Sequence, residues 1–105
     1  MEIIYYNKRT EDFIRNLDGE AAIRTAETIL LLELFGHTLG MPDSKALGGS
    51  LFELRTNGKR RVRIIYMFKN NKAYIIHGFI KKVWRIPQKD IDYARRIQRE
   101  VDMLA

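Results

Sequence analysis

Three runs of β-prone residues, set close together in the second half of the chain, constrain the fold more than any other feature. They cover residues 51–55, 61–68 and 72–80, and each is rich in β-branched and aromatic side chains. Asn57-Gly58 separates the first two runs and Asn70-Asn71 the second two, and such residues tolerate the positive φ angles of hairpin turns. Connections this short join antiparallel strands. The sequence therefore predicts an antiparallel meander.

The residues before the meander predict one strand and two helices. Residues 2–6 have the composition of a short strand. Thr10, followed by two acidic residues, resembles a helix N-cap, and Asp18-Gly19 ends this first helix. A second helix is predicted over residues 20–35, with an apolar stripe at helical spacing facing the core. The stripe consists of Ile23, Ala26, Leu30 and Leu34.

A loop and a final helix complete the predicted order. Residues 37–50 contain several glycines and a proline, so we expect a loop. Pro87 suits the first turn of a last helix, whose apolar stripe runs through Ile91, Ala94, Ile97, Val101 and Leu104. The order β-α-α-β-β-β-α predicts an α+β fold in one domain of residues 1–105. We expect its helices to pack on one face of a small, mostly antiparallel sheet.

Positive charge is concentrated in the meander and the residues that follow it. The formal net charge of the chain is +6, yet no Asp or Glu occurs between Leu54 and Lys89. The basic residues of this acid-free block are Arg55, Lys59, Arg60, Arg61, Arg63, Lys69, Lys72, Lys81, Lys82, Arg85 and Lys89. Such a block is typical both of a solvated basic face and of a surface that binds the phosphates of a nucleic acid.

Some members of the block are harder to attribute to solvation than others. Strand alternation places Arg61 and Arg63 on the same face as Ile65 and Met67. Solvation explains a lysine beside a turn more readily than an arginine between apolar neighbours inside a strand. Further along, a base could stack on Trp84, although a strand-end aromatic that closes the core is an equally open reading.

The residue inventory excludes several kinds of chemistry. There is no cysteine, hence no disulfide, thiolate nucleophile or Cys-ligated metal. The acid-free block offers no converging carboxylates, so we expect no metal and no cofactor. His77 lies mid-strand among apolar residues, where both a structural and a catalytic histidine are open. Neither a signal pattern nor an apolar run of membrane-spanning length is present, and we expect a cytoplasmic protein without membrane contact.

RNA cleavage is one reaction that cations alone can support. RNA supplies its own nucleophile, the 2′-hydroxyl, and needs a base, an acid and groups that stabilise charge on the phosphorane. Like charge lowers the pKa of a lysine among other cations, so one lysine can act as base and another as acid. Arginine stays protonated and binds phosphate through two hydrogen bonds.

Four segments of the chain occur in an order and spacing known from a protein family. They are Leu47–Arg55 (LGGSLFELR), Arg63–Tyr66 (RIIY), His77–Lys82 (HGFIKK) and Pro87. They resemble the stretches KLGGLWELR, RVLY and HxFxKK, with a following proline, of the phage-derived, HigB-like branch of the RelE/ParE toxin superfamily. The resemblance covers most of the chain and implies a RelE-like fold.

The resemblance also implies a function and a site. Many members are toxins of type II toxin–antitoxin modules that cut mRNA, often on the ribosome. A cognate helix-turn-helix antitoxin neutralises them, and operator DNA is contacted only through the toxin–antitoxin complex. The implied catalytic candidates are Arg55, Arg63, Lys81, Lys82 and His77. The candidates for RNA binding are Arg61, Trp84 and Arg85.

Two alternatives remain beside the endoribonuclease. The superfamily also contains ParE-like inhibitors of DNA gyrase, which do not cut RNA, and the fold alone does not separate the two activities. The second alternative is a catalytically inactive RNA-binding module. It is suggested by residues 83–86 (VWRI), which stand where the family usually places threonines.

Overall fold

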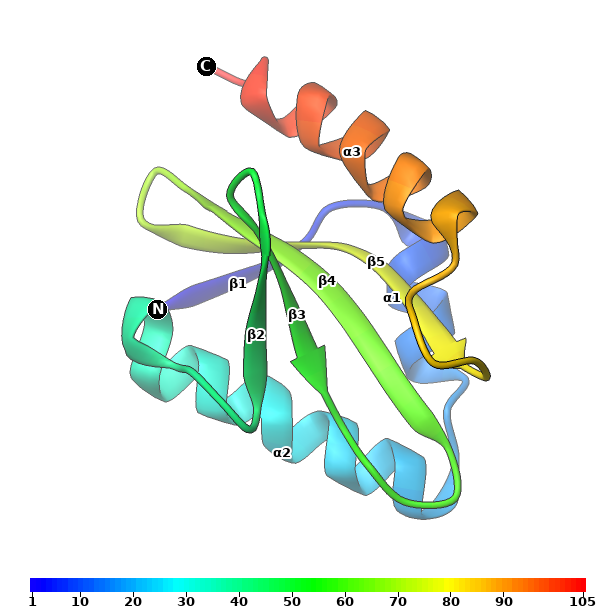
Figure 1. The fold of residues 1–105 in the computed structure, drawn as a ribbon. Helices are drawn as coiled ribbons and strands as arrows, with labels where there is room; N and C mark the ends of the chain where they lie inside the picture. Colours follow the sequence, from blue (N-terminus) through cyan, green and yellow to red (C-terminus); the bar gives the residue numbers. More distant parts are fainter.

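One five-stranded mixed sheet forms the centre of the molecule (Figure 1). The computed structural model describes residues 1–105. In chain order the elements are β1 (Glu2–Tyr5), α1 (Lys8–Arg15), α2 (Gly19–Phe35), the 3-10 helix η1 (Gly36–Thr38), β2 (Ser44–Gly48), β3 (Leu51–Arg55), β4 (Arg61–Lys69), β5 (Lys72–Lys81) and α3 (Gln88–Asp102). The strands lie in the order β1-β5-β4-β3-β2, with β1 parallel to β5 and all other pairs antiparallel. The α+β class and the mostly antiparallel sheet are confirmed.

The predicted meander forms β3, β4 and β5. At the tight turn between β4 and β5, Asn70 and Asn71 have φ angles of 52° and 62°, as the Asn-Asn pair predicted. The turn between β3 and β4 is longer than an Asn-Gly pair requires, because β3 ends at Arg55 and β4 begins at Arg61. Of Asn57 and Gly58, only Gly58 has a positive φ angle.

The prediction of a loop over residues 37–50 is wrong for residues 44–48, which form β2. This edge strand pairs with β3 through a hairpin whose turn residues Gly48, Gly49 and Ser50 all have positive φ angles. Its sequence, SKALG, lacks the β-branched residues that mark a strand. Its pairing to β3 therefore stabilises it, rather than its own propensity.

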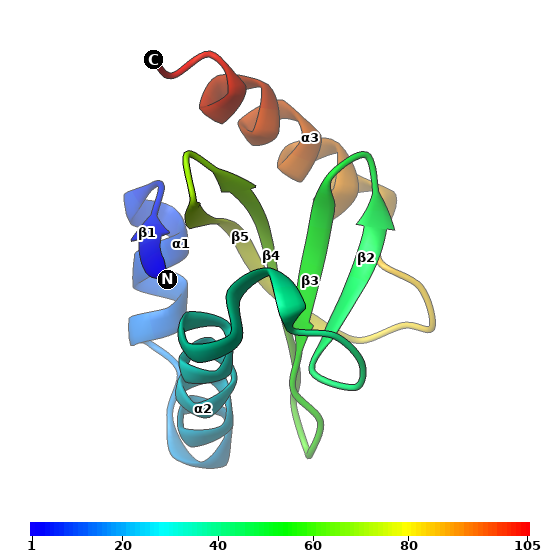
Figure 2. The ribbon, with the colours of Figure 1, turned by 90° about the vertical axis from the view of Figure 1, so that its left-hand side faces the viewer.

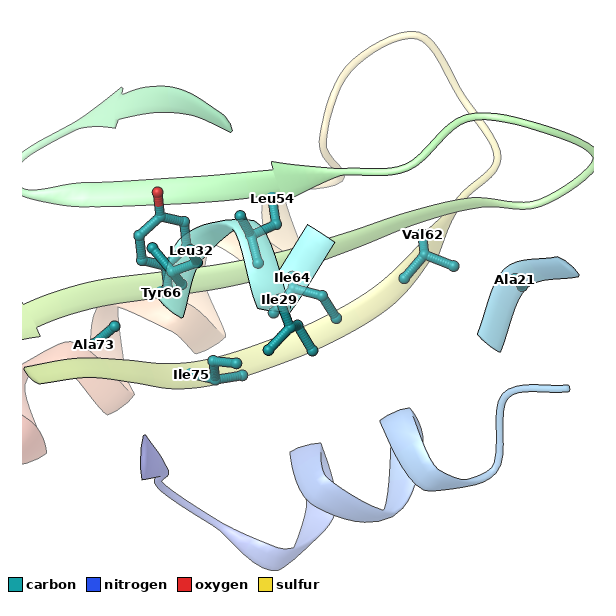
Figure 3. Packing of buried hydrophobic residues seen from close by; sticks show 9 residues of the cluster. All are labelled: Ala21, Ile29, Leu32, Leu54, Val62, Ile64, Tyr66, Ala73 and Ile75. Atoms are coloured by element: carbon teal, nitrogen blue, oxygen red, sulfur yellow. The ribbon is translucent and has the colours of Figure 1, made fainter. Parts of the chain in front are cut away.

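The helices cover both faces of the sheet, and the prediction that they pack on one face is wrong. Helices α1 and α2 lie on one side and α3 on the other (Figures 1 and 2). The first core cluster joins Leu32 of α2 to Ile64 and Ile75 of the sheet (Figure 3). The second joins Ala94 and Val101 of α3 to the opposite face of the same strands. Strands β4 and β5 carry apolar side chains on both faces because helices pack on both faces of the sheet.

The face that α2 turns to the core differs from the predicted one. Ala21, Thr25, Ile29 and Leu32 are buried, whereas Ile23, Leu30 and Leu34 of the predicted stripe are exposed. The buried stripe has helical spacing too, and its small residues let the helix lie close to the sheet. Thr28 is compatible with burial because its hydroxyl donates to the carbonyl of Arg24, at 2.8 Å.

The other two helices begin near the predicted places. Helix α1 starts earlier than expected, since the Asn7 side chain, and not that of Thr10, accepts the capping hydrogen bond, from the Thr10 amide. Helix α3 starts directly after Pro87. Its predicted stripe is buried at its centre but not at Leu104, which lies beyond the end of the helix. None of these helices has the length and apolar character that crossing a membrane requires.

A β-bulge in β5 changes which of its side chains face α3. Tyr66 pairs with Ile75 and Ile65 pairs with His77, so Ile76 is an extra residue in β5. Ile75 packs in the cluster beneath α2 and Ile76 in the cluster beneath α3. After the bulge the alternation resumes with the opposite phase.

Residues beyond the bulge therefore meet the arginines of β4. Phe79 lies opposite Arg63 and Lys81 lies opposite Arg61. Directly opposed residues project to the same face of a sheet. If alternation continued through Ile76 without a bulge, Lys81 would face the α2 side.

Helix α1 packs closely on β5 at Gly78, which yields a stability prediction. A Cβ atom there would lie 2.6 Å from Cδ2 of Phe13 and 3.1 Å from Cδ1 of Ile64. Gly78→Ala is expected to lower the free energy of unfolding by about 1–3 kcal/mol. Gly40→Ala is the matched control, because its Cβ would meet nothing within 4 Å. Urea unfolding followed by circular dichroism measures both, and equal stability of the two variants would contradict this close packing.

Candidate functional site

Four cations from three neighbouring strands meet on the face of the sheet that also carries α3. Arg55 of β3 is directly opposite Arg63 of β4, and Arg61 of β4 is directly opposite Lys81 of β5. The face predicted for Arg61 and Arg63 is confirmed, because their strand neighbours Ile65 and Met67 pack in the cluster beneath α3. We call Arg55, Arg61, Arg63 and Lys81 the cation cluster.

Arg63 is the buried member of the cation cluster. Its exposed fraction is only 2%. Its Nη1 atom donates to the carbonyl oxygens of Thr56, at 2.8 Å, and Val62, at 3.0 Å, while its Nε atom has no partner. Burial lowers the pKa of Arg63. The two carbonyls fix the guanidinium, so the side chain is held in place before any ligand arrives.

Glu53 is a site residue that the sequence reasoning missed. It is 3% exposed, and its Oε1 atom lies 3.6 Å from Nε of Arg55. Its Oε2 atom is buried without a hydrogen-bond partner. Glu53 stands just outside the acid-free block, but it shares a strand face with Arg55, two residues later. That spacing was the available signal, and the expectation of a site without a carboxylate is wrong.

Lys81 lies where several positive charges act on it. Burial lowers its pKa, and the charge of Arg63 lowers it further, ahead of smaller effects from Arg55 and Lys45. The charge of Glu53 acts in the opposite direction. Lys81 therefore loses its proton more readily than an ordinary surface lysine.

An open hollow of about 550 Å³ adjoins the cation cluster and is lined almost entirely by cations. Arg61 and Lys81 contribute to it, together with exposed Lys82 at the end of β5. Lys59 and Arg60, from the turn between β3 and β4, complete the basic lining. The hollow brings both lysines of the HGFIKK segment to one place.

Other members of the acid-free block lie elsewhere. Lys69 and Lys72 flank the β4–β5 turn at the far end of these strands. Lys69 donates to three carbonyl oxygens at the C-terminus of α3, at distances of 2.6 to 2.9 Å. The Nζ atom of Lys72 lies 3.7 Å from Oε1 of Glu2. These two lysines have structural partners and form no part of the cluster.

His77 does not lie among the exposed cations. It is 5% exposed and its Nε2 atom is 2.7 Å from Oδ1 of Asp90, in the first turn of α3. Its ring packs against Phe79 and Tyr93. Burial lowers the pKa of His77, although Asp90 partly offsets this effect. These contacts give His77 a clear structural role in joining α3 to β5.

Trp84 and Arg85 lie in the exposed connection between β5 and α3. The exposed fraction of Trp84 is 94%, so the reading that it closes the core is wrong. A hollow of about 210 Å³ is lined by Arg61, Lys82, Val83 and Trp84. An aromatic face and two cations are thus adjacent, an arrangement suited to a base and its phosphate.

The chemistry of this surface follows from its groups. An arginine held by backbone carbonyls, such as Arg63, can bind phosphate oxygens, and a lysine of lowered pKa gives up its proton more readily than an ordinary lysine. No group of three or more His, Asp or Glu side chains comes together in a way that could hold a metal ion. The arrangement is therefore suited to a phosphodiester as ligand.

The charge of Glu53 yields a second stability prediction. Glu53 pairs with Arg55, and its charge also favours the protonated form of buried Arg63. Glu53→Gln removes this charge and is expected to lower the free energy of unfolding by roughly 3 kcal/mol. The double variant Glu53→Gln/Arg63→Met is expected to be more stable than Glu53→Gln alone. Glu27→Gln, on the exposed face of α2, is the control. A cycle of chemical unfolding experiments that finds no coupling between residues 53 and 63 would contradict this account.

Comparison with known families places the chain in a family. The family described as "Phage derived protein Gp49-like (DUF891)" matches residues 12–99, from within α1 to within α3. The matched segment contains the whole cation cluster, Glu53 and the His77–Asp90 pair. No curated protein matches the chain.

Proposed function

The chain belongs to the phage-derived Gp49-like family, a toxin-type family within the RelE/ParE-like superfamily, and from this premise we propose that it cuts mRNA. It is then the toxin of a type II toxin–antitoxin module of the HigB-like kind. It acts in the cytoplasm without a metal, on mRNA held by the ribosome. The observation that carries this proposal is the cation cluster, with Glu53 and the adjoining basic hollow.

The proposed reaction uses the 2′-hydroxyl of the RNA as nucleophile. Its oxygen forms a bond to the adjacent phosphorus, its proton passes to a base, and the bond from phosphorus to the 5′-oxygen breaks. An acid gives a proton to that leaving oxygen. The products carry a 2′,3′-cyclic phosphate and a 5′-hydroxyl group.

The surroundings of each residue indicate its role in this reaction. Lys81 is the base, because burial and the charge of Arg63 lower its pKa. Lys82, exposed in the same hollow, is the acid. Arg55 and Arg63 stabilise the negative charge on the phosphorane, for which Arg63 is already oriented by its two carbonyl partners.

The remaining candidates bind or position. Arg61, Trp84 and Arg85 hold the RNA on either side of the cut, through phosphate contacts and base stacking. His77 was a catalytic candidate by resemblance, and its burial beneath α3 supports a positioning role instead. A positioning histidine keeps the start of α3 beside β5.

The proposal includes a protein partner. A toxin of this kind is held inactive by a cognate helix-turn-helix antitoxin, and any contact with operator DNA is made by the complex of the two. We expect the antitoxin to bind with a Kd in the nanomolar range or below, about −12 kcal/mol or tighter.

The first functional prediction concerns individual cations. Lys81→Ala, Lys82→Ala or Arg63→Ala is expected to lower the rate of RNA cleavage by about 100-fold or more, because each removes a base, an acid or a charge stabiliser. Lys72→Ala is the control, since Lys72 lies at the far end of β5, and it should change the rate little. Primer extension on translated mRNA measures cleavage, and circular dichroism checks that each variant is folded.

The same variants, together with analysis of the RNA ends and a DNA supercoiling assay, separate the alternatives. Cyclic phosphate ends that persist in excess chelator support the proposed mechanism, provided the ribosomes stay intact. A graded loss across all the cations would indicate an RNA-binding module without catalysis. Intact mRNA together with inhibited DNA supercoiling would indicate a gyrase inhibitor and overturn the proposal.

The second functional prediction concerns pH. A base must be deprotonated to act, so the cleavage rate should rise with pH to a plateau, with its midpoint at the pKa of Lys81, below the ordinary value of 10.5. Arg63→Gln removes a neighbouring positive charge and should move the midpoint of this profile to higher pH. Single-turnover rates on a synthetic RNA give both profiles. An unchanged midpoint would exclude Lys81 as the base.

A further inference from the structure

A second open hollow, of about 510 Å³, lies beside the basic one. It is bounded by α1, the end of β5 and the start of α3, which lie together on one side of the molecule (Figure 1). Ile80 and Lys82 line both hollows. A ligand whose phosphate occupies the basic hollow can therefore extend directly into this one.

An unpaired stretch of β5 forms one wall of the second hollow. Strand β1 pairs with β5 only from Lys72 to Ile75. Residues 77–80 continue the strand and line the hollow, with no strand beside them on that edge. Phe13 of α1 and Phe79 of β5 add apolar surface. This wall is suited to a flat, partly apolar group.

The rim of the second hollow is basic. Arg9 of α1, Lys82 and Lys89 contribute three positive charges from three segments of the chain. The guanidinium of Arg9 lies over the ring of Tyr93, with 4.6 Å between its carbon atom and the ring centroid. This contact orients Arg9. A ligand that combines a flat group with flanking phosphates matches this surface.

A buried carboxylate lies within the hollow. Asp90 is 9% exposed and is one of its lining residues. Its Oδ1 atom is paired with Nε2 of His77 at 2.7 Å. Burial favours the neutral form of this histidine. Because a carboxylate oxygen only accepts, Nε2–H of His77 donates the hydrogen bond to Oδ1. The second oxygen, Oδ2, accepts no hydrogen bond in the structure and is free to accept one from a ligand.

The nucleobases differ in what they offer to such an oxygen. Guanine presents two adjacent donors, N1–H and the N2 amino group, on its Watson–Crick edge. Adenine and cytosine present an acceptor beside their single amino group, and uracil presents one N–H between two carbonyls. Single-stranded RNA is commonly recognised through this edge and by stacking. A carboxylate therefore favours guanine.

We propose that this hollow is a specificity site, which receives a guanine base next to the scissile phosphate and pairs it with Oδ2 of Asp90. The inference rests on the proposed function, since it assigns the base recognition of the same RNA-binding surface. Stacking on the apolar wall orients the ring. Arg9 and Lys89 then bind the flanking phosphates, while Lys82 stays beside the scissile one.

The experiment measures binding of the full chain to RNA that cannot be cleaved. The probes are fluorescein-labelled pentanucleotides, 2′-O-methylated throughout, of sequence UUGUU, UUIUU, UUAUU and UUUUU, where I is inosine. Fluorescence anisotropy is expected to give at least tenfold tighter binding of UUGUU than of UUAUU or UUUUU. UUIUU is expected to bind with intermediate affinity, because inosine keeps N1–H and lacks the amino group.

Asp90→Asn is the decisive variant. Its carbonyl oxygen can still accept the hydrogen bond from His77, while its amide N–H₂ replaces Oδ2 and faces the donors of guanine. The preference for UUGUU over UUAUU should fall to about onefold. Asp92→Asn, an exposed residue of the same helix, makes the same chemical change away from the hollow and should keep the preference.

The outcomes distinguish failure of the specificity site from failure of the proposed function. Wild-type protein that binds all four probes equally, or Asp90→Asn protein that keeps the guanine preference, would overturn the specificity site and leave RNA cleavage untouched. Should Asp90→Asn fail to fold, the comparison of UUGUU with UUIUU on the wild-type chain decides. Wild-type protein that binds no probe at all would overturn the specificity site and count against the proposed function as well.

Discussion

The extra residue in β5 is the constraint on which the functional surface depends. Two-residue alternation would send Lys81 to the side of the sheet covered by α1 and α2, away from the arginines of β3 and β4. Ile76 reverses that phase, so that Lys81 stands opposite Arg61 and Phe79 opposite Arg63. The same reversal leaves Gly78 facing α1, where Phe13 leaves no room for a Cβ atom. Because Ile76 is accommodated as a bulge, Lys81 joins the cation cluster and Gly78 is the residue that α1 packs against.

The cation cluster carries an energetic cost that the rest of the fold offsets. Arg63 and Glu53 are both nearly inaccessible to water, and removing charges from water costs several kcal/mol for each ion. Two carbonyl oxygens accept hydrogen bonds from Arg63, yet one buried nitrogen of Arg63 and one buried oxygen of Glu53 remain unpartnered. A core optimised only for stability would not keep this arrangement. Under the proposed function, the binding of an RNA phosphate replaces the interactions that these groups lost with water.

Local patterns predicted those parts of the molecule that local interactions determine. The meander, its Asn-Asn turn and the inward face of Arg63 follow from strand propensity and alternation. Tertiary contacts decided the rest. Residues 44–48 form a strand because β3 offers a partner, and α2 buries the face of Thr25, Ile29 and Leu32 while leaving Ile23 and Leu30 in solvent. The bulge at Ile76 has no sequence signature at all, so neither the side of the sheet that Lys81 faces nor the pairing of His77 with Asp90 could be derived from periodicity.

The parallel pairing of β1 with β5 has a consequence for the order of events during synthesis. Glu2 pairs with Lys72, so the first strand to leave the ribosome waits for the last strand before it acquires a partner. Arg55 and Arg63 are likewise made before the lysine that completes their cluster. Contacts so distant in sequence form late, because the intervening chain must first be ordered. A nascent chain interrupted before β5 would therefore carry Arg55 and Arg63 without the strand that brings Lys81 beside them.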